Sequence, residues 1–308
     1  MKNVILICPS AEREKWINIF NKLMPKWDIQ SLEGVKNKDL INTALVWNHP
    51  KGILKTFNNL TLICSLGAGV DHLLSDPDIP EGVKVTRIID PLLSFSMSNY
   101  IIMAVLQYQR KFDKYIEDQK NKIWDHDADP EIKISIGILG IGTLGRDAAI
   151  KLKNIGFEVF GFSKSQKKIN GIHCFFGDEI DIFLKKINVL ICTVPYTPET
   201  HNLLSMKLFN RLEKSTYLIN VSRGKVQNEI DIINAINKGV LSGAFLDVFE
   251  KEPLPNSSPL WNHKKIKITP HIASITNAEA GAKQIIENYK RNLEDQKLIN
   301  EVDLKKGY

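Results

Sequence analysis

Cysteine is scarce in this sequence, and no motif is built from it. The 308 residues contain four cysteines, none of them in the C-x-x-C spacing of zinc sites and redox-active dithiols. All four lie in or beside apolar runs, which indicates buried thiols in a reducing compartment. The sequence therefore predicts neither a disulfide-stabilised secreted domain nor a bound metal.

Long apolar runs and dense basic segments are also absent. No run approaches the roughly 18 apolar residues of a membrane span, and the opening MKNVILICPS has too short an apolar stretch for a signal peptide. The net charge of +6 is spread along the chain, without an arginine-rich block or interleaved basic and aromatic residues. We therefore expect a cytoplasmic protein that binds small anionic ligands, with no nucleic-acid and no membrane partner.

What the chain does contain is typical of a globular α/β protein. Its hydrophobic content of 43% and charged content of 25% are average values, and its length suits two domains better than one. Strand-like apolar runs alternate with segments of helical periodicity throughout, which predicts parallel sheets with helical crossovers. Ligands at such sheets bind beyond the carboxyl ends of the strands.

The clearest motif is a glycine-rich turn between a strand and a helix. An apolar run at residues 134–139 leads into GIGTLG at 140–145, and helical periodicity follows from Ala148. The first glycine permits a tight turn, the second lets the backbone approach a pyrophosphate, and the third lets the helix pack close to the strand. A turn without a ligand is the alternative. The residues predicted to bind a dinucleotide are Gly140, Gly142, Thr143, Leu144 and Gly145.

The turn after the next strand, residues 157–162, bears on the choice between NAD and NADP. An NAD-binding unit usually carries an acid there, roughly 20 residues past the glycines, to bind the ribose 2′-hydroxyl. An acid would face a 2′-phosphate at a cost on the order of 4 kcal/mol. This chain instead has Ser163, Lys164 and Ser165, followed by Lys167 and Lys168. We predict NADP(H) as the preferred cofactor and NAD(H) as the alternative, unless the lysines form only a solvated turn.

Two later strands end in residues suited to the nicotinamide end of a cofactor. The strand at 189–194 runs into PYTPET, which is compatible with a cofactor wall and with an ordinary turn. The strand at 217–221 precedes Arg223, which could grip a carboxylate bidentately or form a surface ion pair. The further cofactor contacts predicted here are Val194, Pro195, Thr200 and Val221.

Acid and base groups follow the last two strands of the same sheet. The strand at 241–248 carries Asp247 and leads to Glu252, and the strand at 266–269 leads to His271. Because the carboxyl ends of parallel strands meet at one edge, Arg223, Glu252 and His271 are expected to crowd together there.

The first domain has a glycine-containing turn of its own. The apolar run at 60–65 is followed by LGAGVDH, whose N–H groups can form a small anion nest. A tight turn with Asp71 as a helix N-cap is the alternative. Trp47 ends the neighbouring strand, at 44–47, and either packs in the core or lines the same cleft, which we favour.

These motifs together resemble the D-2-hydroxyacid dehydrogenase family. Within it the chain is most similar to the glyoxylate/hydroxypyruvate reductase A type, through ALVW at 44–47, the serine-containing turn and SPLW at 258–261. Asn99 departs from the glutamate that many relatives carry. The shared motifs, in the family's order, are LGAGVD at 66–71, GILGIGTLG at 137–145, VPYTPET at 194–200, NVSRG at 220–224, LDVFEKEPLP at 246–255 and TPHIAS at 269–274.

The resemblance implies two Rossmann-like or flavodoxin-like parallel-sheet domains with an interdomain cleft. Residues 1–95 with 275–308 would bind the substrate, and residues 96–274 the dinucleotide. Helical periodicity at 95–120 predicts a single helix that joins the domains, and periodicity at 275–298 predicts a helix that returns to the first domain. The long helix and the Trp124 segment imply a homodimer.

The resemblance also implies site roles and a reaction. The catalytic residues would be Arg223, Glu252 and His271, with Asp247 near the nicotinamide carboxamide. The substrate would be held by Trp47, Ala68, Gly69, Val70, Arg223 and His271. The implied activity is NADPH-preferring reduction of glyoxylate and hydroxypyruvate to glycolate and D-glycerate. An NADH-linked D-lactate-type 2-oxoacid reductase and a non-catalytic NAD(P)-sensing binding protein are the alternatives.

Overall fold

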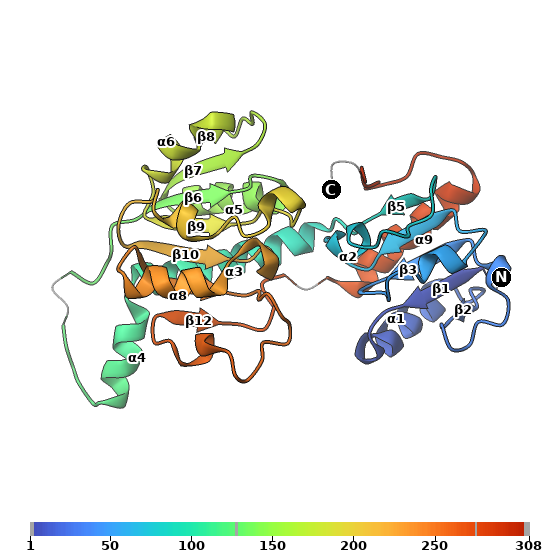
Figure 1. Cartoon of the computed structure of the whole chain (residues 1–308), viewed down its shortest axis with the longest axis horizontal. Helices are drawn as coiled ribbons and strands as arrows, with labels where there is room; N and C mark the ends of the chain where they lie inside the picture. The colour runs from blue at the N-terminus through green and yellow to red at the C-terminus, as the bar shows by residue number, and fades with distance from the viewer. Residues whose placement is uncertain (1–2, 127–128, 275, 305–308) are drawn as a thin grey trace. The chain divides into compact units, whose positions relative to one another are not determined.

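A computed structural model describes residues 3–126, 129–274 and 276–304 (Figure 1). The chain forms two compact units, Met1–Leu93 with Thr276–Tyr308, and Ser94–Ile275. Each unit is built on a sheet whose neighbouring strands all run parallel, so the α/β class expected from the alternating pattern is confirmed. Along the chain, the second unit is inserted within the first.

Among the described residues, the sheet of the first unit has five strands in the order β2-β1-β3-β4-β5, the flavodoxin-like arrangement. The strands are β1 Val4–Ile7, β2 Ile29–Gln30, β3 Thr43–Val46, β4 Leu62–Ser65 and β5 Lys84–Thr86. The helices are α1 Ser10–Leu23, η1 Lys38–Leu40, η2 Leu54–Thr56, α2 Asp71–Leu74 and α9 Ala278–Leu293.

The helix α9 belongs to the core of this first unit. It begins where the side chain of Asn277 accepts hydrogen bonds from the N–H groups of Glu279 and Ala280, which caps its first turn. Tyr289 then packs edge-on against Trp27, with ring centroids 4.8 Å apart, and accepts a 2.8 Å hydrogen bond from Asn3. A helix from near the end of the chain therefore completes the core of the unit that the N-terminal strands form.

In the part of the second unit that the structure describes, the sheet has seven strands in the order β12-β11-β10-β9-β6-β7-β8. Six of them reproduce the 3-2-1-4-5-6 order of dinucleotide-binding folds, and β12 is added at one edge. The strands are β6 Ser135–Leu139, β7 Glu158–Ser163, β8 His173–Phe176, β9 Val189–Cys192, β10 Thr216–Asn220, β11 Leu241–Leu246 and β12 Ile266–Ile268. The helices are α3 Pro91–Gln109, α4 Phe112–Lys120, α5 Thr143–Asn154, η3 Gly177–Glu179, α6 Ile180–Leu184, η4 Pro198–Thr200, α7 Met206–Phe209, η5 Gly224–Val226, α8 Glu229–Asn237 and η6 Pro259–Asn262.

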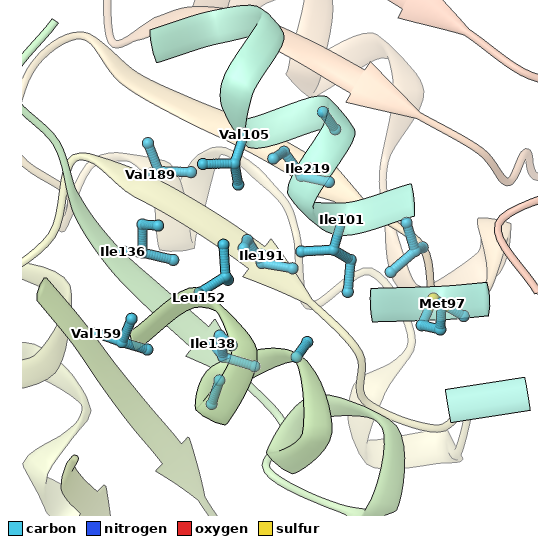
Figure 2. Close-up of a cluster of buried hydrophobic side chains, with 14 of the residues drawn as sticks. Met97, Ile101, Val105, Ile136, Ile138, Leu152, Val159, Val189, Ile191 and Ile219 are labelled. Carbon is cyan, nitrogen blue, oxygen red and sulfur yellow. The ribbon is translucent and has the colours of Figure 1, made fainter. Parts of the chain in front are cut away.

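Helices cover both faces of this larger sheet. On one face, Figure 2 shows Ile101 and Val105 of α3 and Leu152 of α5 gathered with Ile136 and Ile191 of the central strands. On the other face the buried side chains of α6 and α8 pack on the same strands; they include Phe183, Leu184, Ile232 and Ala235. The apolar runs are therefore buried on both sides, and polar side chains gather in the loops at the strand ends.

Several predicted boundaries were wrong. The single helix expected at 95–120 is two helices, because Lys111 adopts a left-handed conformation (φ 51°) between α3 and α4. The strand expected to reach 194 ends at Cys192, and the return helix ends at Leu293 instead of 298. Asp71 is the first residue of α2 and Val70 is its N-cap. Residue 275, where the return helix was expected to begin, lies outside the described residues.

Candidate active site

The glycine-rich turn joins β6 to α5 as a closely packed unit. Gly140 has a φ of +102°, and a Cβ on it would lie 2.9 Å from the backbone nitrogen of Val194. A Cβ on Gly145 would lie 2.1 Å from the carbonyl oxygen of Gly140, so that only glycine lets the helix approach the strand. Both positions therefore require glycine.

Gly142 differs, because space lies beside it. Apart from Gly142 and its two chain neighbours, no described residue has an atom within 4 Å of the position that its Cβ would take. Among the same residues, the N–H groups of Gly142, Thr143 and Leu144 have no hydrogen-bond partner. Free donors at a helix N-terminus, facing open space, fit the pyrophosphate of a dinucleotide.

The turn after β7 contains the serine and lysine side chains expected to bind a 2′-phosphate. The hydroxyl of Ser163 donates to the carbonyl of Ser165 at 2.7 Å. Lys164 Nζ lies 2.8 and 3.1 Å from the carboxylate oxygens of Glu199 on η4. Sequence reasoning gave Glu199 no role, since the two residues are 35 positions apart.

The loop after β9 is held by its own hydroxyls. Thr200 Oγ1 accepts a 2.7 Å hydrogen bond from the N–H of Thr197 and donates to the carbonyl of Pro195 at 2.8 Å. Val194 lies against the glycine turn, whereas the side chain of Val221 is buried in the core. Thr200 therefore shapes the loop through bonds internal to it.

The loops after β11 and β12 meet in an imidazole–carboxylate pair. His271 Nδ1 lies 2.7 Å from Glu252 Oε2, while Glu252 Oε1 accepts a 3.0 Å hydrogen bond from the N–H of Phe249. Burial alone would raise the pKa of Glu252. The hydrogen bonds from His271 and Phe249, with the charges of His271 and Arg223, outweigh burial and lower the pKa. The carboxylate is therefore ionised beside the ring.

Asp247 fixes the backbone on both sides of His271. Its carboxylate accepts 2.8 Å hydrogen bonds from the N–H groups of Ile272 and Ala273 and a 2.6 Å bond from the hydroxyl of Thr269. Its carbonyl accepts from the N–H of His271 at 2.9 Å, and His271 has a φ of +55°. Burial raises the pKa of Asp247. The buried carboxylate thus holds the loop in the conformation that turns the imidazole toward Glu252.

Arg223 is brought to the same edge by a backbone contact. A Cβ on Gly224 would lie 1.8 Å from the carbonyl carbon and oxygen of Phe249, so the loop after β10 touches the loop that carries Glu252. The half-buried Arg223 donates from Nη1 to the carbonyl of Ser222 at 2.8 Å. Its charge contributes to the lowered pKa of Glu252.

A buried amide network beneath Arg223 was missed by sequence reasoning. Asn220 Nδ2 donates to Gln227 Oε1 at 2.7 Å, and Gln227 Nε2 donates to the carbonyl of Val248 at 2.9 Å. Asn220 Oδ1 accepts from the N–H of Ser222 at 3.0 Å. Both amides are fully buried, so this network ties the loops after β10 and β11 together. The asparagine of the NVSRG motif was the available signal.

The glycine turn of the first unit presents unpaired backbone donors. Within the described residues, the N–H groups of Ala68, Gly69 and Val70 have no hydrogen-bond partner. The loop is shaped by Ser65, whose hydroxyl donates to the carbonyl of Gly69 at 3.0 Å. Trp47 is half-buried, and its ring lies against Gly67. Successive N–H groups in a glycine-containing turn suit a small carboxylate.

In the described ranges 3–126, 129–274 and 276–304, no group of three or more His, Cys, Asp or Glu side chains could hold a metal ion. No helix in those ranges is both long enough and apolar enough to cross a membrane.

A doubly wound sheet that presents free helix N–H groups and a paired imidazole at one edge defines a class, the nicotinamide-dependent dehydrogenases. Comparison with known proteins narrows the class. A family model described as D-isomer specific 2-hydroxyacid dehydrogenase, NAD binding domain, matches residues 102–273. The chain belongs to the D-isomer specific 2-hydroxyacid dehydrogenase family.

Relatives match the chain over its whole length. Glyoxylate/hydroxypyruvate reductase A of Yersinia enterocolitica is 34% identical, covering 99% of this chain and 100% of that protein. The same reductase of Serratia proteamaculans is 36% identical, with the same coverage.

Solved structures of similar proteins match the fold of the whole chain. A D-isomer specific 2-hydroxyacid dehydrogenase of Xanthobacter autotrophicus, in complex with NADPH and MES, has a TM-score of 0.92 at 34% identity, covering 100% of this chain and 99% of that one. An NADPH-dependent glyoxylate/hydroxypyruvate reductase of Sinorhizobium meliloti, in complex with NADP and sulfate, has a TM-score of 0.93 at 31% identity, covering 100% of both chains.

Proposed function

We propose that this protein is an NADPH-preferring reductase of small 2-oxo acids that converts glyoxylate to glycolate and hydroxypyruvate to D-glycerate. The 2.7 Å pair between His271 and Glu252, at the strand edge that carries the glycine turn, is the observation that carries the proposal. The substrates are supported by the full-length relatives named as glyoxylate/hydroxypyruvate reductases.

Reduction of a 2-oxo acid requires a proton donor for the carbonyl oxygen and a fixed positive charge beside the substrate. When bound, NADPH supplies the hydride that reduces the 2-oxo carbon. His271 donates a proton from Nε2 to the substrate oxygen as negative charge builds there. The ionised Glu252 pairs with the opposite ring nitrogen, Nδ1, which orients the imidazole and places a negative charge beside it.

Arg223 and the turn at 66–70 hold the substrate in this proposal. The guanidinium of Arg223 presents several donors in a plane, which suits a carboxylate beside a carbonyl oxygen. The free N–H groups of Ala68, Gly69 and Val70 bind the carboxylate, and Trp47 bounds the site beside them. Residues 1–95 with 275–308 therefore act as the substrate-binding domain, and residues 96–274 as the dinucleotide-binding domain.

The preference for NADPH is assigned to the turn after β7. Ser163, Lys164 and Ser165 provide hydroxyl and ammonium donors, and the residues directly after the strand include no acid. The carboxylate of Glu199, 2.8 Å from Lys164 Nζ, would exchange this partner for the 2′-phosphate. The two solved relatives with NADPH or NADP bound support this assignment. NAD(H) is the weaker alternative cofactor.

We also propose that the enzyme is a cytoplasmic homodimer. Exposed apolar side chains continue from α3 through α4 to the segment beyond it, and Trp124 is 86% exposed. A second copy of the chain would cover such a surface. The unpaired state of Cys8, Cys64, Cys174 and Cys192 supports a reducing compartment.

The test is a cofactor oxidation assay with purified protein. NADPH and glyoxylate are mixed with the protein, and cofactor absorbance is followed; NADH and a panel of 2-oxo acids are then compared. We expect oxidation with glyoxylate and hydroxypyruvate, faster with NADPH. Preference for NADH and pyruvate would favour the D-lactate-type reductase, and no oxidation with any 2-oxo acid would favour a non-catalytic nucleotide sensor.

A further inference from the structure

A buried imidazole–carboxylate pair lies in the first unit, apart from His271 and Glu252. His49 Nε2 lies 2.9 Å from Asp76 Oδ2, and both side chains are fully buried. Asp76 also accepts hydrogen bonds of 3.0 Å from the N–H groups of Gly52 and Asp78. The proposed reaction gives neither residue a role.

The pair connects to the substrate turn through two aromatic rings. The ring of His49 meets that of His72 edge to face, with centroids 5.8 Å apart. The ring of His72 in turn lies 4.8 Å from that of Trp47. The indole lies where a Cβ on Gly67 would be, within 2.6 Å. A continuous line of contacts therefore runs from Asp76 to the backbone of the turn.

Packing alone is a poor explanation for these polar groups. Among the described residues, the buried Nδ1 of His49 has no hydrogen-bond partner, which is an unfavourable arrangement that an apolar ring would avoid. Burial would raise the pKa of Asp76, but the hydrogen bonds from Asp78, Gly52 and His49 lower it. The ionised carboxylate can therefore fix the rotation of the imidazole, which an apolar side chain at position 49 would leave to packing.

We propose that His49 and Asp76 are positioning residues for the substrate turn. They hold the rings of His72 and Trp47 against Gly67 and so fix the N–H groups of residues 68–70 for a short 2-oxo acid. The inference rests on the proposed function, in which that turn and Trp47 contact the substrate. The pair would act on substrate binding indirectly, through the two rings, and would not affect cofactor binding.

The test compares His49→Gln and Asp76→Asn with a matched control. Asp78→Asn is the control, because Asp78 lies in the same loop and its side chain forms an exposed pair with Lys55 at 3.1 Å. We expect both variants to raise the KM for glyoxylate about tenfold, with the KM for NADPH within about twofold of wild type. The control should keep all constants. If the variants lose thermal stability and apparent kcat while the KM for glyoxylate stays unchanged, the pair is merely structural and the inference is overturned.

A double-mutant cycle with Trp47→Ala separates this inference from the proposed function. If His49 acts through Trp47, His49→Gln should add little to the KM for glyoxylate once the indole is gone. Full additivity of the two effects would overturn the inference. If Trp47→Ala itself leaves every 2-oxo acid KM unchanged, the proposed placement of Trp47 at the substrate fails instead. Asp76→Asn keeps an acceptor for Gly52 and Asp78, so one variant of the set is expected to fold.

Discussion

The substitution Glu252→Gln tests whether the carboxylate stabilises the charged imidazole. The N–H of Phe249 requires an acceptor, so the amide oxygen takes the place of Oε1 and the amide NH₂ faces His271 Nδ1. A donor facing that nitrogen disfavours the protonated ring. The variant therefore keeps the shape of the site and removes the negative charge that lies 2.7 Å from His271 Nδ1.

The size of the effect follows from the distance and the exposure. Two unit charges about 4 Å apart interact by about 4 kcal/mol at an effective dielectric of 20. The two side chains are 38% and 35% exposed, so solvent screening reduces the interaction to about 1–2 kcal/mol. That corresponds to a rate of glyoxylate reduction about 5- to 30-fold lower near neutral pH.

The pH profile makes the test specific. Because the pKa of Glu252 is lowered, its carboxylate stays charged as the pH falls and its support for the ring is lost only in acid. In Glu252→Gln, the loss of rate in acid that follows protonation of Glu252 should disappear from the profile, because an amide does not titrate. Initial rates at saturating NADPH across a pH series measure this. Glu250→Gln, in the same loop, is the control, and its amide oxygen can still accept from the N–H of Glu229. An unshifted profile with a normal rate would refute the reasoning.

Three further predictions concern the cofactor, the proton and the loop contact. Ser163→Asp should lower the ratio of kcat/KM for NADPH over NADH by about tenfold or more, because the new carboxylate repels a 2′-phosphate; an unmoved ratio in paired assays would contradict the assignment of the turn. His271→Asn should lower kcat about 100-fold or more while NADPH affinity, measured by fluorescence titration, stays near normal; near-normal turnover would exclude His271 as the proton donor. Gly224→Ala should destabilise the second unit by about 1–3 kcal/mol, because its Cβ would collide with the backbone of Phe249; an unchanged denaturation midpoint would contradict the close approach, and Gly142→Ala, where no described atom lies within 4 Å, should fold normally.

The sheet architecture could be predicted because parallel strands that are buried on both faces have uninterrupted apolar sequences. The run at 134–139 and the glycines after it gave β6, the turn and α5 together, since each glycine meets a separate steric requirement. The break at Lys111 could not be predicted, because helical periodicity continues across it and only one residue changes conformation. Helix α8 was missed, and only the structure revealed its Asn228 cap and buried Ile232 and Ala235.

The types of residue at the site could be predicted from the sequence. The residues that hold them in position could not. Parallel topology alone placed His271, Glu252 and Arg223 at one edge, but the identity of the supporting residues depends on contacts between loops. The bonds of Asp247 to the backbone around His271, and the burial of Gln227, follow from how those loops pack. The pairing of Lys164 with Glu199 has the same origin. Sequence spacing carries no record of such contacts.

The insertion of one unit within the other has a consequence for the order in which a newly made chain can fold. Residues 94–275 are continuous, so that segment can close its sheet as soon as it has left the ribosome. The opening strands cannot bury Trp27 against Tyr289, 262 positions later, until translation is almost complete. During synthesis the apolar surface of the N-terminal strands therefore stays exposed to solvent. A chaperone or a neighbouring nascent chain would bind to that surface.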